Sequence, residues 1–242
     1  MTGGGTGGSS GGGSGGSGGG SGVETPVHKP LEITFSDDTP ADVRIKQQEM
    51  FDEMPEKLRD ALARAGTEIN VGPRADGTPG WERFAKVTGY DSETTIADGR
   101  ELGTLSFFQW DTNQIFISTD HPGGSVNVYV HEMAHAIDAK FLGETYVVEF
   151  PPDSGKMVDV NAISDDPGWK EMHTTYVLNN PHVNSYYRGG PSGKSPLMGR
   201  RETFAEGFAI YNKYGRSGLV GWLRSEDGAD EIIDLWKYWK VI

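Results

Sequence analysis

The chain has 242 residues, a net charge of −13 and no cysteine. The absence of cysteine excludes disulfide scaffolds, thiol nucleophiles and Cys-ligated metal sites. The acidic charge disfavours nucleic acids and anionic membranes as partners. No apolar run approaches the roughly 18 residues of a transmembrane helix, and the N-terminus has neither the basic region nor the apolar core of a signal peptide.

Residues 1–22 contain only Met, Thr, Gly and Ser. This composition is typical of a flexible linker, so we expect a disordered segment there. Residues 23–242 hold all six Trp, nine Tyr and ten Phe of the chain, which is ample for packing. They are long enough for one domain with its own core.

The first half of this domain is expected to contain helices and a small sheet. Residues 23–38 form an extended lead-in, and Thr39-Pro40 looks like a helix N-cap followed by a first-turn proline. Further elements are expected in the following order: a helix to about residue 53, a helix over 56–65, a strand over 67–71, a short helix over 81–87, and a β-hairpin of 105–109 with 114–118.

The second half is predicted to be mainly helical. The Gly-Gly-Ser segment at 123–125 opens a helix that runs to about residue 141 and carries one apolar stripe. Further helices are expected over 166–178, 200–214 and 229–241, with a loop over 181–199. The whole chain is therefore expected to be helix-rich with one small sheet, which is an α+β fold.

The segment at 131–135 reads His-Glu-Met-Ala-His, an HExxH motif on a predicted helix. Positions i and i+4 share a helix face, so His131 and His135 can bind one zinc ion while Glu132 faces water at the metal. The alternatives are a chance match or two hydrogen-bonded core histidines. The amphipathic helix that follows a hairpin favours the metal, and one zinc per chain is expected.

A catalytic zinc needs a third protein ligand and an open position for water. Glu202 and Glu206 are four residues apart on one face of the predicted 200–214 helix. One of them can bind the metal while the other holds an imidazole through its second nitrogen. The alternative is a solvated acidic face. Glu144 and Glu149 lie nearer to the motif, but their extended, proline-limited stretch places them poorly.

Taken together, the chain resembles the catalytic domain of the anthrax-toxin lethal-factor family, which includes the bacterial Pro-Pro endopeptidases. The resemblance covers roughly residues 40–215 and rests on three segments: His-Glu-Met-Ala-His-Ala-Ile-Asp, Ile-Ser-Asp-Asp-Pro-Gly-Trp, and Glu-Thr-Phe-Ala-Glu-Gly-Phe-Ala-Ile-Tyr. It implies a zincin-like fold with a small mixed sheet packed on the HExxH helix. It also implies that the preceding hairpin offers an edge strand to an extended peptide.

The resemblance assigns roles to particular residues. It implies His131, His135 and Glu202 as zinc ligands, Glu132 as the general base, and Glu206 as the acid that holds a ligand imidazole.

The family also has a tyrosine that stabilises the oxyanion, but Ser195 stands at the matching position here. Tyr187, in a lengthened loop upstream, is the candidate replacement, with Tyr186 beside it; the alternative is that both tyrosines only pack.

The predicted function is that of a zinc-dependent endopeptidase acting on an extended segment of a protein or peptide substrate. An inactive peptide-binding module and a tethered structural or virion protein are the alternatives. We expect a monomer without nucleic-acid or membrane partners. The resemblance favours a secreted, virion-associated or toxin-associated protein, and the acidic charge favours basic substrate segments. His28, His121, His173 and His182 are expected to be surface or structural residues.

Overall fold

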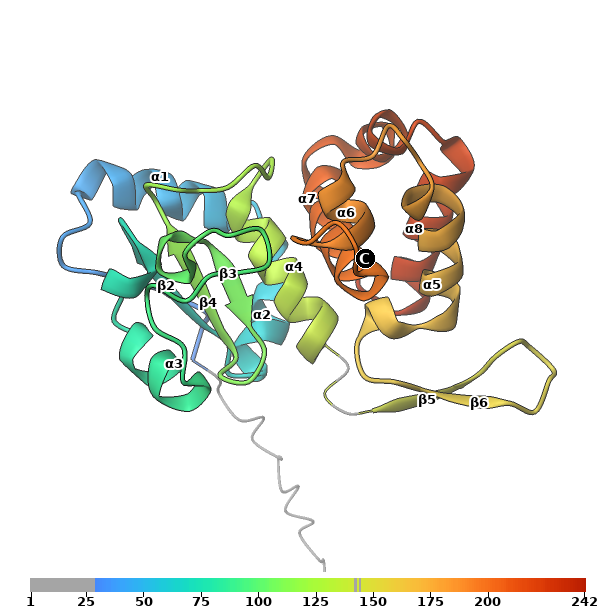
Figure 1. The fold of residues 1–242 in the computed structure, drawn as a ribbon, viewed down its shortest axis with the longest axis horizontal. Coiled ribbons are helices and arrows are strands. Elements are labelled where there is room, and N and C mark those ends of the chain that lie inside the picture. The colour runs from blue at the N-terminus through green and yellow to red at the C-terminus, as the bar shows by residue number, and fades with distance from the viewer. Residues whose placement is uncertain (1–28, 142, 144) are drawn as a thin grey trace, which may run out of the picture.

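The computed structural model describes residues 29–141, 143 and 145–242 (Figure 1). The linker expected at 1–22, the domain start at 23 and His28 lie outside these described residues. A sheet-bearing half and a helical half lie on either side of helix α4 (Val128–Lys140) (Figure 1). Among the described residues, no helix combines the length and the apolar character needed to cross a bilayer.

A four-stranded mixed sheet forms the first half. Its order is β1 (Ile33–Phe35), β2 (Glu68–Gly72), β4 (Gln114–Ser118) and β3 (Phe107–Gln109). The first three strands are parallel, and β3 pairs antiparallel with β4 at one edge. The predicted hairpin and the strand predicted over 67–71 are therefore confirmed. β1 occupies part of the expected extended lead-in, where it pairs with β2.

Three helices belong to the same half: α1 (Ala41–Asp52), α2 (Glu56–Arg64) and α3 (Trp81–Thr88). All three confirm the predicted helices to within one residue at either end. Thr39 does not cap α1, because its hydroxyl shares a 2.8 Å hydrogen bond with that of Ser36 and Pro40 takes the N-cap position. Gly66 follows α2 in the left-handed region that favours glycine, with φ of 71°.

Helix α4 carries the HExxH motif and begins later than predicted. The Oδ1 of Asn127 accepts hydrogen bonds from the backbone N–H groups of Tyr129 and Val130 at 3.0 and 3.2 Å, so Asn127 is the N-cap. Gly123 has a φ of 81° and lies in the preceding loop. Nearly every residue of α4 is buried, because the sheet-bearing half contacts one side and helix α7 the other.

The second half begins with a two-stranded hairpin that projects from the helices (Figure 1). The hairpin consists of β5 (Tyr146–Glu149) and β6 (Met157–Val160). The helices of the second half are, in chain order, α5 (Pro167–His173), a π-helical continuation over Thr174–Leu178, α6 (Ser185–Gly189), α7 (Pro196–Leu223) and α8 (Glu226–Tyr238). Three short 3-10 turns complete the described elements, at Ala75–Gly77, Leu102–Thr104 and Ile163–Asp165.

Several features of this half correct the prediction. The β5–β6 hairpin adds a second sheet where one was expected, and α8 begins at Glu226, three residues before the predicted start. The segment 181–199 is not all loop, since it contains α6 and the first turn of α7. Ser195 caps α7 by accepting a hydrogen bond from the Met198 N–H at 3.3 Å, and Pro196 follows at the first helical position. Helix α7 also runs past the predicted end at 214, with a kink at Gly215 where φ is 64°.

The main apolar core joins both halves through α4. Met133 on α4 packs in one cluster with Ile69 of the sheet, Phe204 of α7 and Trp236 of α8. Because α4 and α7 are held side by side by this core, the polar residues between them are positioned by rigid elements.

Candidate metal centre and active site

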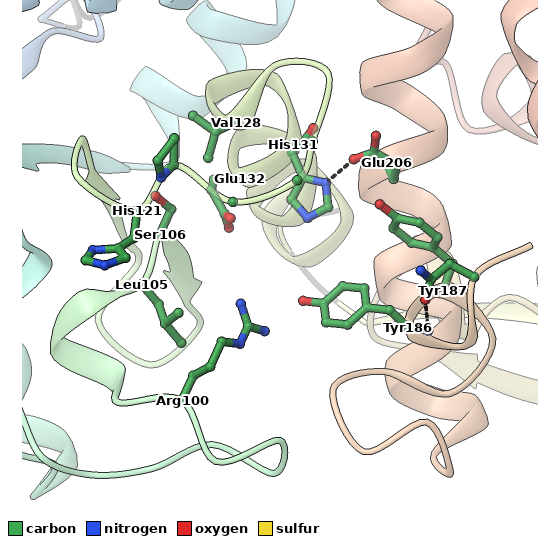
Figure 2. Close-up of a pocket in the computed structure, with 15 residues that line it drawn as sticks. Arg100, Leu105, Ser106, His121, Val128, His131, Glu132, Tyr186, Tyr187 and Glu206 are labelled. Carbon is green, nitrogen blue, oxygen red and sulfur yellow. Dashed lines mark hydrogen bonds and ion pairs between the residues drawn. The ribbon is translucent and has the colours of Figure 1, made fainter.

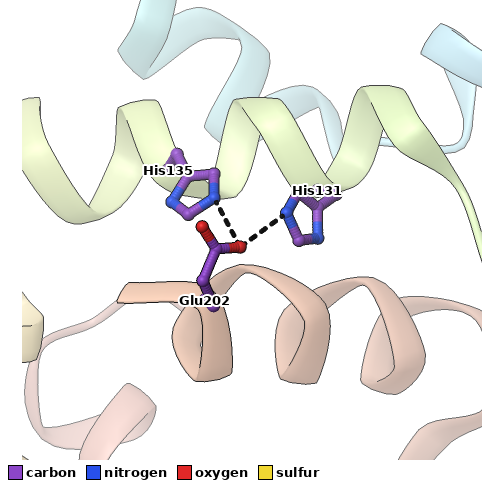
Figure 3. A group of neighbouring side chains, drawn as sticks. All are labelled: His131, His135 and Glu202. Carbon is purple, nitrogen blue, oxygen red and sulfur yellow. Dashed lines mark ion pairs between the residues drawn. The ribbon is translucent and has the colours of Figure 1, made fainter. Parts of the chain in front are cut away.

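Three side chains from α4 and α7 converge between the two helices (Figure 3). The Nε2 atoms of His131 and His135 each lie 3.4 Å from Oε2 of Glu202. One potential ligand atom from each residue lies within 4.8 Å of the others. The helical spacing places both imidazoles on the α7 side of α4, as the motif predicts, and brings Glu202 to them from 67 positions downstream of His135 (202 − 135 = 67).

The second carboxylate of α7 reaches the other nitrogen of His131. Oε2 of Glu206 lies 2.9 Å from His131 Nδ1, and Oε1 accepts a hydrogen bond from the Val126 N–H at 3.4 Å. A carboxylate at this nitrogen fixes the ring orientation and directs Nε2 towards Glu202. The two glutamates therefore occupy different positions around one imidazole.

The site fits a divalent cation by its donor set. Glu202 Oε2 is buried and accepts no hydrogen bond from any described residue, although two imidazole nitrogens face it. Two imidazoles and one carboxylate are a common ligand set for catalytic zinc. A cation would satisfy the buried oxygen and balance the carboxylates that gather here.

The electrostatics of the ligands favour an ionised Glu202. Burial raises the pKa of this carboxyl, but the positive potential of His135 and His131 and their close polar contacts at 3.4 Å outweigh it and hold the pKa well below its usual range. Burial lowers the pKa of His131, whereas its polar contact with Glu202 and its hydrogen bond with Glu206 raise it, and the net shift is upward. Protons and a metal ion therefore compete for the same imidazole.

Glu132 lies next to this cluster and faces the cleft (Figure 2). Its side chain is buried, and burial raises the pKa of its carboxyl, while His131 and His135 partly oppose that rise. The Phe108 N–H of β3 also lowers this pKa, so the carboxylate lies close to the edge strand of the sheet. A carboxyl in this environment is suited to accept and return a proton.

The cleft consists of two adjoining pockets of about 230 Å³ each. Both are lined by the same central residues, including His131, Glu132 and Tyr186. We call the pocket lined by His121, Gly123 and Tyr187 the His121 arm. We call the pocket lined by His135, Trp110 and Arg201 the His135 arm. An extended chain could pass from one arm to the other across Glu132.

The two candidate tyrosines point in different directions (Figure 2). Tyr186 lines both arms, and burial together with the charges of Glu202 and Glu132 raises the pKa of its hydroxyl, which leaves it a neutral donor. Tyr187 lines only the His121 arm and packs edge-on against Trp222 at 5.4 Å. The hydroxyl of Tyr187 points towards Glu206 (Figure 2). The geometry thus favours Tyr186 over the predicted Tyr187 as the residue that faces the centre of the cleft.

The remaining candidates lie elsewhere or serve the fold. Glu149 is exposed on β5, and Glu144 lies outside the described residues. His121 lines the cleft but does not belong to the described three-residue cluster. His173 is buried with its Nε2 3.2 Å from the Tyr187 carbonyl, and His182 is exposed.

Sequence analysis missed several residues that line the cleft. Arg100 lies across it from Tyr186 (Figure 2) and is held by Asp98 at 2.7 and 2.9 Å. Trp110 and Arg201 line the His135 arm. No spacing rule links these residues to the HExxH motif, because they reach the cleft from a turn, a strand end and a helix that only tertiary packing brings together.

The comparisons with known proteins give one informative result. No family model matches the chain, and no curated protein matches it either. Among solved structures, the Pro-Pro endopeptidase PPEP-2 from Paenibacillus alvei is similar with a TM-score of 0.53 and 15% sequence identity. The match covers 84% of this chain and 96% of that chain.

This likeness establishes the type of fold. The chain has the helix-rich α+β, zincin-like architecture that the sequence predicts, with a small mixed sheet beside the HExxH helix. Its described residues include a buried His-His-Glu cluster that could hold a metal. At this level of identity the likeness shows the fold alone, so the chemistry has to be argued from the site.

Proposed function

We propose that this protein is a zinc-dependent endopeptidase. The observation that carries the proposal is the convergence of His131, His135 and Glu202 beside Glu132 in an open cleft. The three ligand candidates are the donor set of a catalytic zinc site, and Glu132 adds the acid-base group that hydrolysis needs. The fold of a Pro-Pro endopeptidase supports a peptidase over other metal-dependent hydrolases.

The metal would be held by the Nε2 atoms of the two histidines and by the Glu202 carboxylate. Zinc in such a site supplies Lewis-acid polarisation of a carbonyl and makes water a better nucleophile at neutral pH. Glu206 keeps the His131 ring in place through Nδ1. One zinc per chain is expected.

The chain's own residues then divide the work of hydrolysis. Glu132 accepts a proton from the attacking water and returns it to the nitrogen of the leaving amine. The hydroxyl of Tyr186 points into the centre of the cleft (Figure 2), where it can donate a hydrogen bond to the scissile carbonyl oxygen as negative charge develops there. We therefore assign to Tyr186 the role that sequence analysis gave to Tyr187.

Strand β3 supports an extended substrate. It is the edge strand of the described four-stranded sheet, and Phe107 and Phe108 line the cleft. An extended peptide can add to such an edge through main-chain hydrogen bonds while its side chains enter adjacent pockets. A peptide in this position would pass Glu132 and Tyr186.

The alternative function is an inactive peptide-binding module with the same fold. The serine at position 195, where the resemblance expects the oxyanion tyrosine, favours this alternative. The position of Tyr186 in both arms of the cleft weakens this argument and supports the catalytic proposal. The tethered structural or virion role depends only on residues 1–22, which lie outside the described residues.

Zinc content and peptide cleavage test the proposal together. The purified protein should contain about one zinc per chain, as measured by inductively coupled plasma mass spectrometry. It should also cut an unfolded protein such as casein. A chelator should abolish cleavage and added zinc should restore it. Zinc binding without cleavage of casein or of a mixed peptide library that includes Pro-Pro bonds would favour the binding module. Absence of zinc binding would end the peptidase proposal.

A further inference from the structure

The two arms of the cleft differ in chemistry. Apolar side chains line much of the His135 arm, among them Ile96, Leu102, Phe107 and Met198. Arg201 also lines this arm, one position before the ligand candidate Glu202 on α7. Arg201 is half-buried here, beside these apolar side chains and several carboxylates, and the position of its charge needs a physical reason because partial burial of a charge is costly.

The guanidinium of Arg201 makes an aromatic contact but no ion pair. Its central carbon lies over the ring of Trp110, 5.2 Å from the ring centroid. Its Nε is buried and has no hydrogen-bond partner among the described residues. Contact with a ring uses the face of the guanidinium, so the N–H groups at its edge remain suited to a carboxylate.

The neighbouring arginine provides a direct contrast. Arg200 donates from Nε to the Ser164 carbonyl at 3.0 Å and pairs with Asp165 at 3.4 Å. No carboxylate oxygen of a described residue lies within 4.0 Å of a guanidinium nitrogen of Arg201, so Arg201 forms no ion pair among these residues. The chain carries 35 acidic and 22 basic residues, so acids outnumber the available cations. Arg201 nevertheless faces the cleft without an acidic partner.

The other charges around this arm leave Arg201 available. Three carboxylates line the same pocket: Glu132, Glu202 and Asp138. Glu132 and Glu202 belong to the proposed catalytic centre, and both oxygens of Asp138 accept hydrogen bonds from Ser164, at 2.6 Å from the N–H and 2.7 Å from the hydroxyl. Arg201 is close enough to stabilise the charge of Asp138, but it forms no ion pair with it. Lys140 adds a second cation, with its Nζ 5.1 Å from the centroid of the Trp110 ring. Arg100 lines the arm as well but is paired with Asp98.

We propose that the His135 arm is a subsite for a carboxylate of the substrate, with Arg201 as its ion-pair partner and Trp110 as the surface that orients the guanidinium. This inference rests on the proposed endopeptidase function and names its substrate class: peptides that carry a carboxylate on one side of the cleaved bond. It differs from what the overall charge of −13 indicates, which is a preference for basic segments.

Paired peptide libraries test this subsite. Both libraries carry either Glu or Gln at random at positions on both sides of the cleaved bond. The peptides of the first library have amidated C-termini, and those of the second have free C-termini. Cleavage by the wild-type protein, followed by mass spectrometry, should enrich Glu over Gln by at least about 10-fold at one position, the size expected for a hydrogen-bonded charge pair. Faster cleavage of the peptides with free C-termini, with equal use of Glu and Gln, would assign the carboxylate to the chain terminus and overturn the side-chain subsite.

Three variants separate the charge from packing. Arg201→Gln should reduce the Glu-to-Gln ratio to near one, and Arg201→Lys, which keeps the charge, should still favour Glu. Lys86→Gln, on the exposed surface of α3, removes one positive charge away from the cleft and should keep the wild-type ratio. A wild-type protein without any carboxylate preference, or an Arg201→Gln protein that keeps it, would overturn the subsite.

Failure of the endopeptidase proposal would be seen separately. If the wild-type protein cuts neither library, the same peptides are passed over the immobilised protein and the retained fraction is sequenced. Retention of Glu peptides by the wild type and its loss in Arg201→Gln would uphold the subsite without catalysis. Equal retention of Glu and Gln peptides would refute it.

Discussion

Glu206 holds His131 from the side opposite the ligand cluster, with its Oε2 2.9 Å from Nδ1 of the ring. Glu202, one turn earlier on α7, faces the Nε2 of the same ring at 3.4 Å. One imidazole is thus placed between two carboxylates of a single helix. Because only one of the two can reach the metal position, their removal should have different effects.

The first prediction concerns these two glutamates. Glu202→Ala removes one of three ligand candidates and should purify with little zinc, since two histidines hold zinc weakly. Glu206→Ala should keep the ligands but weaken zinc binding by about 10–100-fold, because the His131 ring loses its support. Competition with a coloured chelator measures both affinities. Exposed Glu171→Ala is the control, and full zinc in Glu202→Ala would show that the third ligand lies elsewhere.

The second prediction separates metal binding from proton transfer. Glu132→Gln preserves the shape of the side chain and should keep about one zinc per chain and a near-native melting temperature. Its turnover should fall by about 10²–10⁴-fold or more, because an amide cannot accept the proton of the attacking water. Metal analysis and steady-state kinetics on one peptide give both quantities. A variant that turns over at the wild-type rate would remove Glu132 from the mechanism.

The third prediction compares the adjacent tyrosines. Tyr186→Phe should lower kcat by about 10²–10³-fold with zinc retained, because it removes a donor to the developing oxyanion. Tyr187→Phe is the matched control and should have a much smaller effect, since its ring packs against Trp222 and its hydroxyl points towards Glu206. The reverse order of effects would return the catalytic role to Tyr187.

The fourth prediction follows from the buried pair of Asp138 and Ser164. Burial raises the pKa of Asp138 from 3.8 to about 6, despite the two hydrogen bonds from Ser164 that oppose the rise. At pH values between 3.8 and about 6, the folded state therefore binds more protons at Asp138 than the unfolded state does. The stabilising contribution of this protonation is fully present below pH 3.8 and is lost as the pH rises through about 6.

Asp138→Asn should lack this pH dependence. The free energy of unfolding of the wild type, relative to the variant, should fall by about 3 kcal/mol between pH 3.5 and 7, as about 1.4 kcal/mol per pKa unit implies. Urea unfolding with a chelator present, at several pH values, gives the difference. Parallel pH profiles for the two proteins would contradict the raised pKa.

The fifth prediction concerns the contact that positions α6 and its tyrosines. A Cβ at Gly199 would lie 2.3 Å from the Arg188 carbonyl oxygen and 2.8 Å from the Gly189 nitrogen. Gly199→Ala should therefore destabilise the protein by about 1–3 kcal/mol and lower kcat by displacing Tyr186. Gly221→Ala on the same helix is the control, because a Cβ there meets no atom within 4 Å and should stabilise slightly. Equal stability of the two variants would show that α6 can move without cost.

Much of the fold and the ligand set could be predicted from local signals. The apolar spacing of Leu58 and Leu62 and the glycine at 66 mark α2, and helical spacing places His131 with His135 and Glu202 with Glu206. The single apolar stripe predicted for α4 was wrong, because α4 is buried on almost all sides. Helix α6 was missed because its five residues, the last of them Gly189, are too few to show a periodicity and are followed by Gly190 and Pro191. The hairpin of β5 and β6 was missed because each strand has only four residues; Pro151 and Pro152, which made the stretch look unsuited to a strand, lie in the turn between them.

The choice between the two tyrosines could not be made from the sequence. Adjacent residues on a helix point about 100° apart, so the existence of α6 decides which hydroxyl enters the cleft. The position of Arg201 against Trp110 likewise depends on the packing of α7 beside the end of β3. Both outcomes arise from tertiary contacts between segments far apart in the chain.

The division of the ligand candidates between α4 and α7 links metal binding to folding. An ion held by His135 and Glu202 would connect α4, the helix between the two halves, to α7 of the helical half. Because the unfolded chain does not present these atoms together, free metal at about 100 times its dissociation constant would add about 2.7 kcal/mol to the free energy of unfolding. The melting temperature would then rise with zinc concentration, and the ion would stabilise the packing of α4 on α7 as well as take part in catalysis.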